Sequence, residues 1–130
     1  AERMEKERIE NMPKFHLRFG GCSGFGCNIS LVIKNISNNI SYDIKIYDIR
    51  IQELKKTLWE SFEEITASNI DAKGELTVRL NSPSFNDKKE LQLIACMSCK
   101  DKYSDVHEYL LRINCNYPNI YTSEEIKEIT

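Results

Sequence analysis

The chain has 130 residues, of which 41% are hydrophobic, and its formal net charge is −2. This length and composition fit one domain whose single core needs neither disulfides nor a metal to fold. The small net charge gives no basic surface for nucleic acid or an anionic membrane, and no apolar run approaches the roughly 20 residues that cross a bilayer, so we exclude these roles for the chain itself.

Residues 1–13 are expected to form a helical tail. The segment reads AERMEKERIENM before Pro13, a composition that favours helix but gives an apolar stripe too thin to bury. Proline disfavours the helical conformation in the residue before it, so the helix ends there. We expect the natural polypeptide to continue upstream through a longer helix or a membrane anchor, which is the only expected link to a membrane. We also expect the tail to add a contact between copies of the chain, giving a homo-oligomer.

Residues 14–130 are predicted to form a β-sandwich domain, because the period of the apolar residues changes to two. Alternation predicts one strand in KFHLRF and a second in NISLVIKNI, joined by the glycine-dense loop GGCSGFGC. The turn NISNN leads into ISYDIKIYDIRI, where the apolar parity slips by one residue after Ile46. Such a slip predicts a β-bulge or a strand that is buried on both faces.

The second half of the chain mixes clear strands with two helical signals. QELKKTLWESFEEI is predicted to form a short helix or helical turn, because residues 54, 58, 62 and 65 are apolar at helical spacing. A turn at residues 71–74 precedes the strand ELTVRLN, and the charged turn KDKYS joins the long strands ELQLIACMSC and DVHEYLLRINC. The chain ends in TSEEIKEIT, which predicts a short C-terminal helix capped by Ser123 or Thr122.

About seven short strands with short connections predict an all-β fold, an antiparallel β-sandwich. The segments LVIKNISNNISYDIKI, IDAKGELTVRL and LQLIACMSCKDKYSDVHEYLLRI carry this pattern. Over residues 15–113 the chain resembles immunoglobulin-like domains of uncharacterised bacterial proteins. The resemblance implies an immunoglobulin-like sandwich, often preceded by a transmembrane segment and a helical linker, and it brings no catalytic residues. The chain departs from the pattern at Lys73, where such domains commonly have proline, and in the cysteines of its last hairpin.

The cysteines raise the question of a metal site or a disulfide framework. The spacing in CSGFGC and CMSC is that of paired zinc ligands, which would be Cys22, Cys27, Cys96 and Cys99. Against this, residues three apart in a strand point to opposite faces, so the two sulfurs of CMSC converge only if the strand ends or bulges.

The chain has five cysteines, an odd number that argues against full disulfide pairing, although Cys22 and Cys27 would close a small loop in an oxidising compartment. The odd number favours the cytoplasmic side of a membrane. We expect unlinked thiols and no cofactor, with Cys99 and Cys115 acting as small apolar side chains.

Catalytic candidates are few. His16 shares a polar strand face with Lys14 and Arg18, which is typical of a solvated side chain. His107 has the parity of the buried positions, which favours a half-buried histidine of the core or of a turn. No glycine-rich phosphate loop leads from a strand into a helix. We therefore predict a protein that is not an enzyme.

The predicted function is a non-catalytic binding or structural module, a soluble domain of a larger and membrane-anchored protein. The glycine-dense loop is the candidate surface for an unidentified protein partner, because glycine lets a partner approach the backbone. The residues of this binding loop are Gly20, Gly21, Ser23, Gly24, Phe25 and Gly26. The alternative is a zinc-stabilised interaction module that uses the four paired cysteines.

Overall fold

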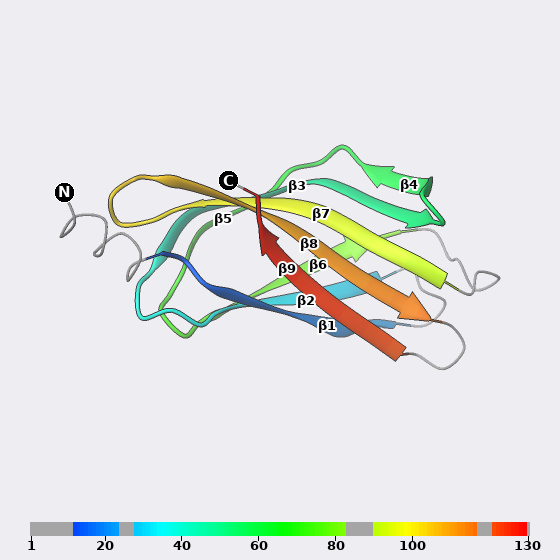
Figure 1. Cartoon of the computed structure of the whole chain (residues 1–130), viewed down its shortest axis with the longest axis horizontal. Coiled ribbons are helices and arrows are strands. Elements are labelled where there is room, and N and C mark those ends of the chain that lie inside the picture. The colour runs from blue at the N-terminus through cyan, green and yellow to red at the C-terminus, as the bar shows by residue number, and fades with distance from the viewer. Residues whose placement is uncertain (1–11, 24–27, 83–89, 117–120, 130) are drawn as a thin grey trace.

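The computed structural model describes residues 12–23, 28–82, 90–116 and 121–129, and these residues form two antiparallel sheets that face each other (Figure 1). The smaller sheet has the order β1-β2-β6, and its strands are β1 (Phe15–Ser23), β2 (Asn28–Asn35) and β6 (Glu75–Asn81). The larger sheet has the order β4-β3-β7-β8-β9, with β5 paired to another part of β3. Its strands are β3 (Ser41–Glu53), β4 (Lys56–Ser61), β5 (Ile65–Ile70), β7 (Glu90–Lys100), β8 (Val106–Asn116) and β9 (Tyr121–Glu128). The prediction of an all-β antiparallel sandwich is confirmed, although the described residues form nine strands where about seven were expected.

The core lies between the two sheets and consists mainly of aliphatic side chains. Alternate residues of each strand point inward, as the period of two in the sequence predicts. The most deeply buried large side chains include Leu31, Ile33 and Val78 from the smaller sheet and Ile44, Ile46, Met97, Leu111 and Ile113 from the larger one. Full burial of one such side chain contributes about 1.5–3 kcal/mol, so these contacts hold the sheets together.

β3 repeats a five-residue sequence, YDIKI followed directly by YDIRI. The aspartate of each copy has a positive φ, 47° at Asp43 and 51° at Asp48, and the register with β7 shifts beside each one. Aspartate tolerates this left-handed conformation better than most residues do. The β-bulge at Asp48 therefore produces the phase slip that was expected after Ile46. A second bulge, at Asp43, lies in the first copy, and the isoleucines of both copies lie in the core. These are Ile44, Ile46, Ile49 and Ile51.

The segment QELKKTLWESFEEI, which was expected to be a short helix or helical turn, is a hairpin. Residues 52–66 contain the end of β3, a turn at Leu54 and Lys55, β4 and the start of β5. The helical spacing was misleading because the apolar residues do not share one buried face. Leu54 lies at the tip of the hairpin and Phe62 follows β4, and both side chains are exposed.

The predicted C-terminal helix is also wrong, because TSEEIKE belongs to β9. β9 pairs antiparallel with β8 from Asn116 opposite Tyr121 to Tyr109 opposite Glu128. A helix cap contributes only about 1 kcal/mol, which a ladder of backbone hydrogen bonds along β8 outweighs. The predicted N-terminal tail falls on residues 1–11, outside the described residues, and residues 12–14 are not helical.

The two sheets approach each other where β9 lies beside β1 (Figure 1). The backbone N–H of Phe19 in β1 donates to Glu124 Oε1 in β9 at 3.3 Å. On the opposite side of the sandwich, the larger sheet ends in β4 and β5, and the smaller sheet ends in β6. Nowhere in the described ranges is there a helix with the length and apolar character needed to span a membrane.

Candidate functional site

The glycine-dense segment is less of a loop than the sequence suggested. Gly20, Gly21 and Ser23 belong to β1, which corrects the expected loop boundary. A Cβ at Gly20 would lie 3.0 Å from the Cβ of Ser30, so glycine here allows close approach of β2. The strand register also shifts around Gly20. The other predicted binding residues, 24–26, lie outside the described residues.

The two cysteines of CMSC lie on opposite faces of β7, as expected for residues three apart in a strand. Cys99 is 1% exposed in the core, whereas Cys96 is half-buried on the other face. Their sulfurs therefore do not converge on one ion. Cys22 pairs with Ile29 in the β1–β2 ladder, and Cys27 lies outside the described residues. Within the described ranges, no group of three or more His, Cys, Asp or Glu side chains is placed to hold a metal.

The environment of both β7 thiols favours the protonated form. Burial raises the pKa of Cys99 to about 12, and the nearby carboxylates of Asp101 and Glu128 act in the same direction. Burial also raises the pKa of Cys96, and Asp48 adds to this effect. A nucleophilic or metal-binding cysteine needs the thiolate, so these surroundings suit inert thiols.

The turn between β7 and β8 holds a cluster of charged side chains that the sequence reasoning missed. His107 Nε2 lies 2.8 Å from Asp101 Oδ2, and His107 Nδ1 lies 3.6 Å from Glu128 Oε1. The side chain of His107 is only 13% exposed, which confirms the expectation of a half-buried histidine. The Nε2–Oδ2 distance is that of a hydrogen bond, whereas Nδ1 and Glu128 Oε1 are farther apart than a hydrogen bond allows. The imidazole ring therefore lies between the turn and the end of β9.

Asp101 also shapes the turn itself. Its Oδ1 accepts hydrogen bonds from the backbone N–H groups of Tyr103 at 2.8 Å and Asp105 at 3.1 Å. Burial raises the pKa of Asp101, whereas the hydrogen bonds from His107 and from these two amides lower it. The lowering is the larger effect, so the pKa of Asp101 lies below its usual value. The ionised carboxylate therefore acts as a structural clamp at this end of the sandwich.

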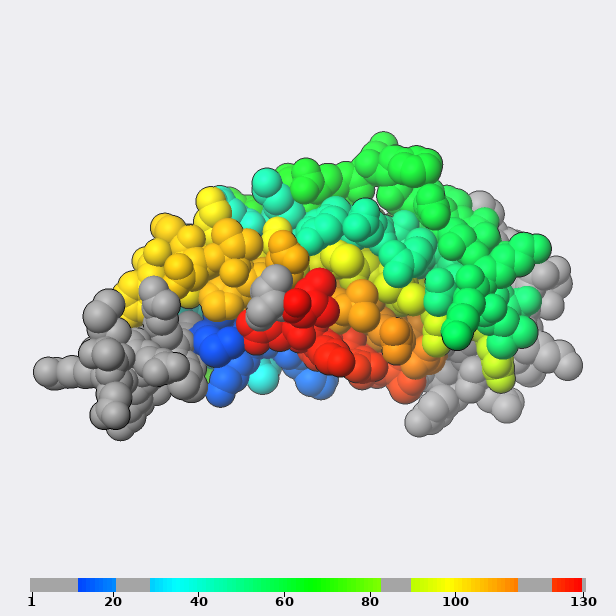
Figure 2. All heavy atoms as spheres, turned by 45° about the horizontal axis from the view of Figure 1, so that its top comes forward, coloured from blue at the N-terminus to red at the C-terminus, as the bar shows by residue number. Residues whose placement is uncertain are grey.

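The hairpin of β3 and β4 lies at the edge of the larger sheet, and Figure 2 shows its green atoms at the rim of the molecule. We call residues 54–62 the β4 edge. β4 pairs with β3 on one side, and none of the described strands pairs with it on the other. Leu54 is 82% exposed and Phe62 is 93% exposed. Large apolar side chains beside a free strand edge are typical of a contact surface.

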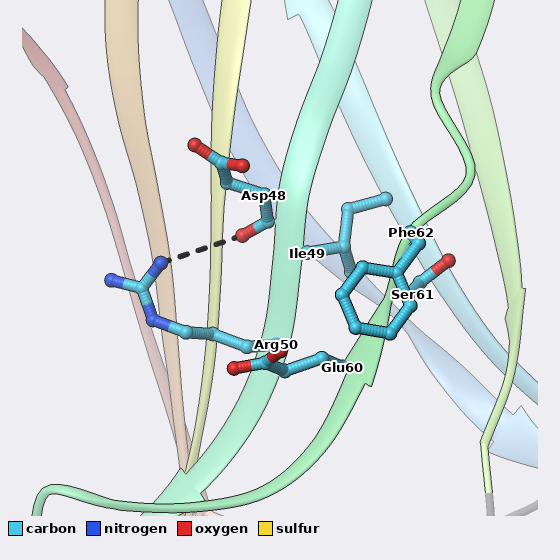
Figure 3. A pocket seen from close by; sticks show the side chains of 6 residues that line it. All are labelled: Asp48, Ile49, Arg50, Glu60, Ser61 and Phe62. Atoms are coloured by element: carbon cyan, nitrogen blue, oxygen red, sulfur yellow. Dashed lines mark hydrogen bonds between the residues drawn. The ribbon is translucent and has the colours of Figure 1, made fainter.

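A hollow of about 120 Å³ lies beside the ring of Phe62 (Figure 3). Its lining residues are Asp48, Ile49, Arg50, Glu60, Ser61 and Phe62. Arg50 Nη1 donates to the backbone carbonyl of Asp48 at 3.5 Å, a contact that leaves most of the guanidinium free for other partners. Ligand sites for small molecules usually measure about 300–1,000 Å³, so this hollow fits one side chain of a partner better than a substrate.

The structure thus brings together two groups of residues that the sequence did not connect. The Asp101–His107–Glu128 cluster is a clamp within the fold, whereas the β4 edge presents apolar and charged side chains to solvent. The sequence held a signal for part of each group, since a tight turn between paired strands places Asp101 near His107, and LKKTLWESF has charged residues between its apolar ones. Comparison of the chain with protein-family models, curated proteins and solved structures found no match.

Proposed function

We propose that the protein is a non-catalytic binding module that takes an extended segment of a protein partner at the β4 edge. The exposure of Leu54 and Phe62 beside an unpaired strand is the observation that carries this proposal. A free strand edge offers backbone N–H and C=O groups to an added strand, and neighbouring apolar side chains supply affinity. Burial of one aromatic ring contributes about 1.5–3 kcal/mol, or roughly a 10- to 100-fold change in affinity.

We further propose that the sandwich is of the immunoglobulin-like type and belongs to a larger, membrane-anchored protein. The strand order supports the first part, because β1-β2-β6 and β3-β7-β8 correspond to the A-B-E and C-F-G neighbours of such sandwiches. The resemblance of residues 15–113 supports the second part. A fold alone does not define a function, so the binding role rests on the β4 edge.

Selection of peptides from a random displayed library against the wild-type protein tests the proposed function. Enriched peptides are then measured against Phe62→Ser and against Tyr103→Ser as a matched control. Tyr103 is another exposed aromatic residue, 46% accessible, but it lies in the turn at the other end of β7. We expect Phe62→Ser to weaken binding at least about 10-fold and the control to leave it unchanged.

Mapping of the bound peptide by NMR chemical shifts locates the surface independently. Shifts should concentrate on β4 and on the residues around the hollow. The proposal fails if no peptide is enriched, if Phe62→Ser binds as well as wild type, or if the shifts map to another face.

A further inference from the structure

The order of charges along the β4 edge identifies the kind of partner, an inference that rests on the proposed function. Lys55 and Lys56 lie at its beginning, and Glu60 lies near its end, followed by Glu63 and Glu64. All five side chains are exposed, and none makes an ion pair with another described residue. Within residues 54–64 one end is therefore basic and the other acidic, while Glu53 and Arg50 of β3 lie opposite Lys56 and Glu60.

This arrangement is self-complementary when two copies of the strand pair antiparallel. A two-fold axis near Leu58 brings the basic end of one copy beside the acidic end of the other. The same operation brings Leu54 of one copy toward Phe62 of the second. Parallel pairing would instead place lysines beside lysines and glutamates beside glutamates, which is unfavourable across strands.

We infer that the protein forms a homodimer in which the β4 edges of two copies pair antiparallel about a two-fold axis. The pairing joins the two larger sheets into one continuous sheet and removes both exposed apolar side chains from water. A run of one charge along the edge would repel a second copy, as protected edge strands commonly do. The split charge of the β4 edge attracts one.

The dimer is expected to be weak and dependent on salt. A standard stable interface uses about 20–30 residues from each partner, whereas the β4 edge consists of residues 54–62. Exposed charges attract less strongly as the ionic strength rises, with a screening length of about 8 Å at physiological salt. We therefore expect a dissociation constant between about 10 μM and 1 mM at low salt, which increases with added salt.

Charge reversal with complementation tests the dimer by sedimentation velocity over that range of concentration. Lys55→Glu with Lys56→Glu makes the edge acidic throughout, and Glu60→Lys with Glu63→Lys makes it largely basic. We expect each double variant alone to dissociate at least about 10-fold more readily than wild type, and an equimolar mixture to associate again. The matched control, Lys102→Glu with Lys127→Glu, changes exposed lysines outside the β4 edge and should leave association unchanged.

The inference is overturned if wild type remains monomeric over this range, if neither variant changes association, or if the mixture does not restore it. A monomeric wild type whose selected peptides still require Phe62 would refute the homodimer and leave the proposed function intact. A monomer for which Phe62→Ser has no effect on peptide binding would refute both.

Discussion

Replacement of Asp101 by asparagine should destabilise the β7–β8 turn by about 2 kcal/mol. Asp101 is 8% exposed, and its Oδ2 lies 2.8 Å from His107 Nε2. Asparagine can still accept from the amides of Tyr103 and Asp105, but it has no charged oxygen for the hydrogen bond with His107 Nε2. Hydrogen bonds to charged groups contribute about 1.5–3 kcal/mol, which sets the expected loss. Asp101→Ala also leaves both amides without their acceptor and should cost about 4 kcal/mol.

Urea unfolding at neutral pH measures this loss. With a slope of about 2 kcal/mol/M, the midpoint of Asp101→Asn should fall by about 1 M. Asp43→Asn is the matched control, because Asp43 forms an exposed ion pair with Lys100 at 3.3 Å and its side chain is 60% accessible. Exposed pairs contribute about 0–1 kcal/mol, so the control should move the midpoint little.

The pKa of Asp101 also determines how the stability of the protein depends on pH. Burial raises the pKa of Asp101 and its hydrogen bonds lower it more, so the folded-state pKa is below that of the unfolded chain, which is about 3.9. The stabilisation by this carboxylate is therefore complete above about pH 4 and is lost as the pH falls through the folded-state pKa. Wild type and Asp101→Asn should converge in stability in that acidic range. A difference below about 0.5 kcal/mol at neutral pH, or one that does not shrink in acid, would refute the clamp.

Three further changes probe the hairpin, the thiols and the core. Leu54→Asn with Lys55→Gly should raise the free energy of unfolding by about 1 kcal/mol, because both residues have positive φ (48° and 68°); equal or lower stability in urea would contradict this. A maleimide should label Cys96 faster than Cys99, which is 1% exposed, and peptide mapping that finds equal rates would be inconsistent with the fold. Asn35→Ala should lower the free energy of unfolding by about 3 kcal/mol. The fully buried amide donates to two backbone carbonyls and accepts from a backbone N–H and a hydroxyl. A loss below about 1 kcal/mol in thermal unfolding would show that these hydrogen bonds contribute little.

Periodicity predicted those parts of the fold in which backbone pairing and side-chain burial agree. Leu76, Val78 and Leu80 in β6 alternate with Glu75, Thr77 and Arg79, and Val78 and Leu80 are buried in the core. The hairpin around β4 was missed because Leu54 and Phe62 matched helical spacing although neither is buried. The spacing of apolar residues predicts a buried face only when another element covers that face. The local sequence does not show whether such an element is present.

The errors at the site follow from the errors in the fold. A turn between two paired strands places Asp101 near His107, and this contact was within reach of sequence reasoning. The contact with Glu128 was not, because a C-terminal helix was expected in place of β9. The complementary charges of the β4 edge could not be predicted either, because a helix was expected there. On a helix the same lysines and glutamates would form an ordinary solvated face.

One bulge of the β3 repeat marks the boundary between the ladders of β4 and β5. β3 pairs with β5 along Ser41–Ile46 and with β4 along Ile49–Glu53, and the bulge at Asp48 falls between these two ladders. A bulge bends the strand and increases its twist. On one side of β3, β7 accommodates both bulges and pairs from Tyr42 to Gln52. On the other side the chain supplies two short partners, and the connection between them begins at Phe62. The exposed side chain of Phe62 therefore lies beside the bulge at Asp48, which also returns Ile49 and Ile51 to the core.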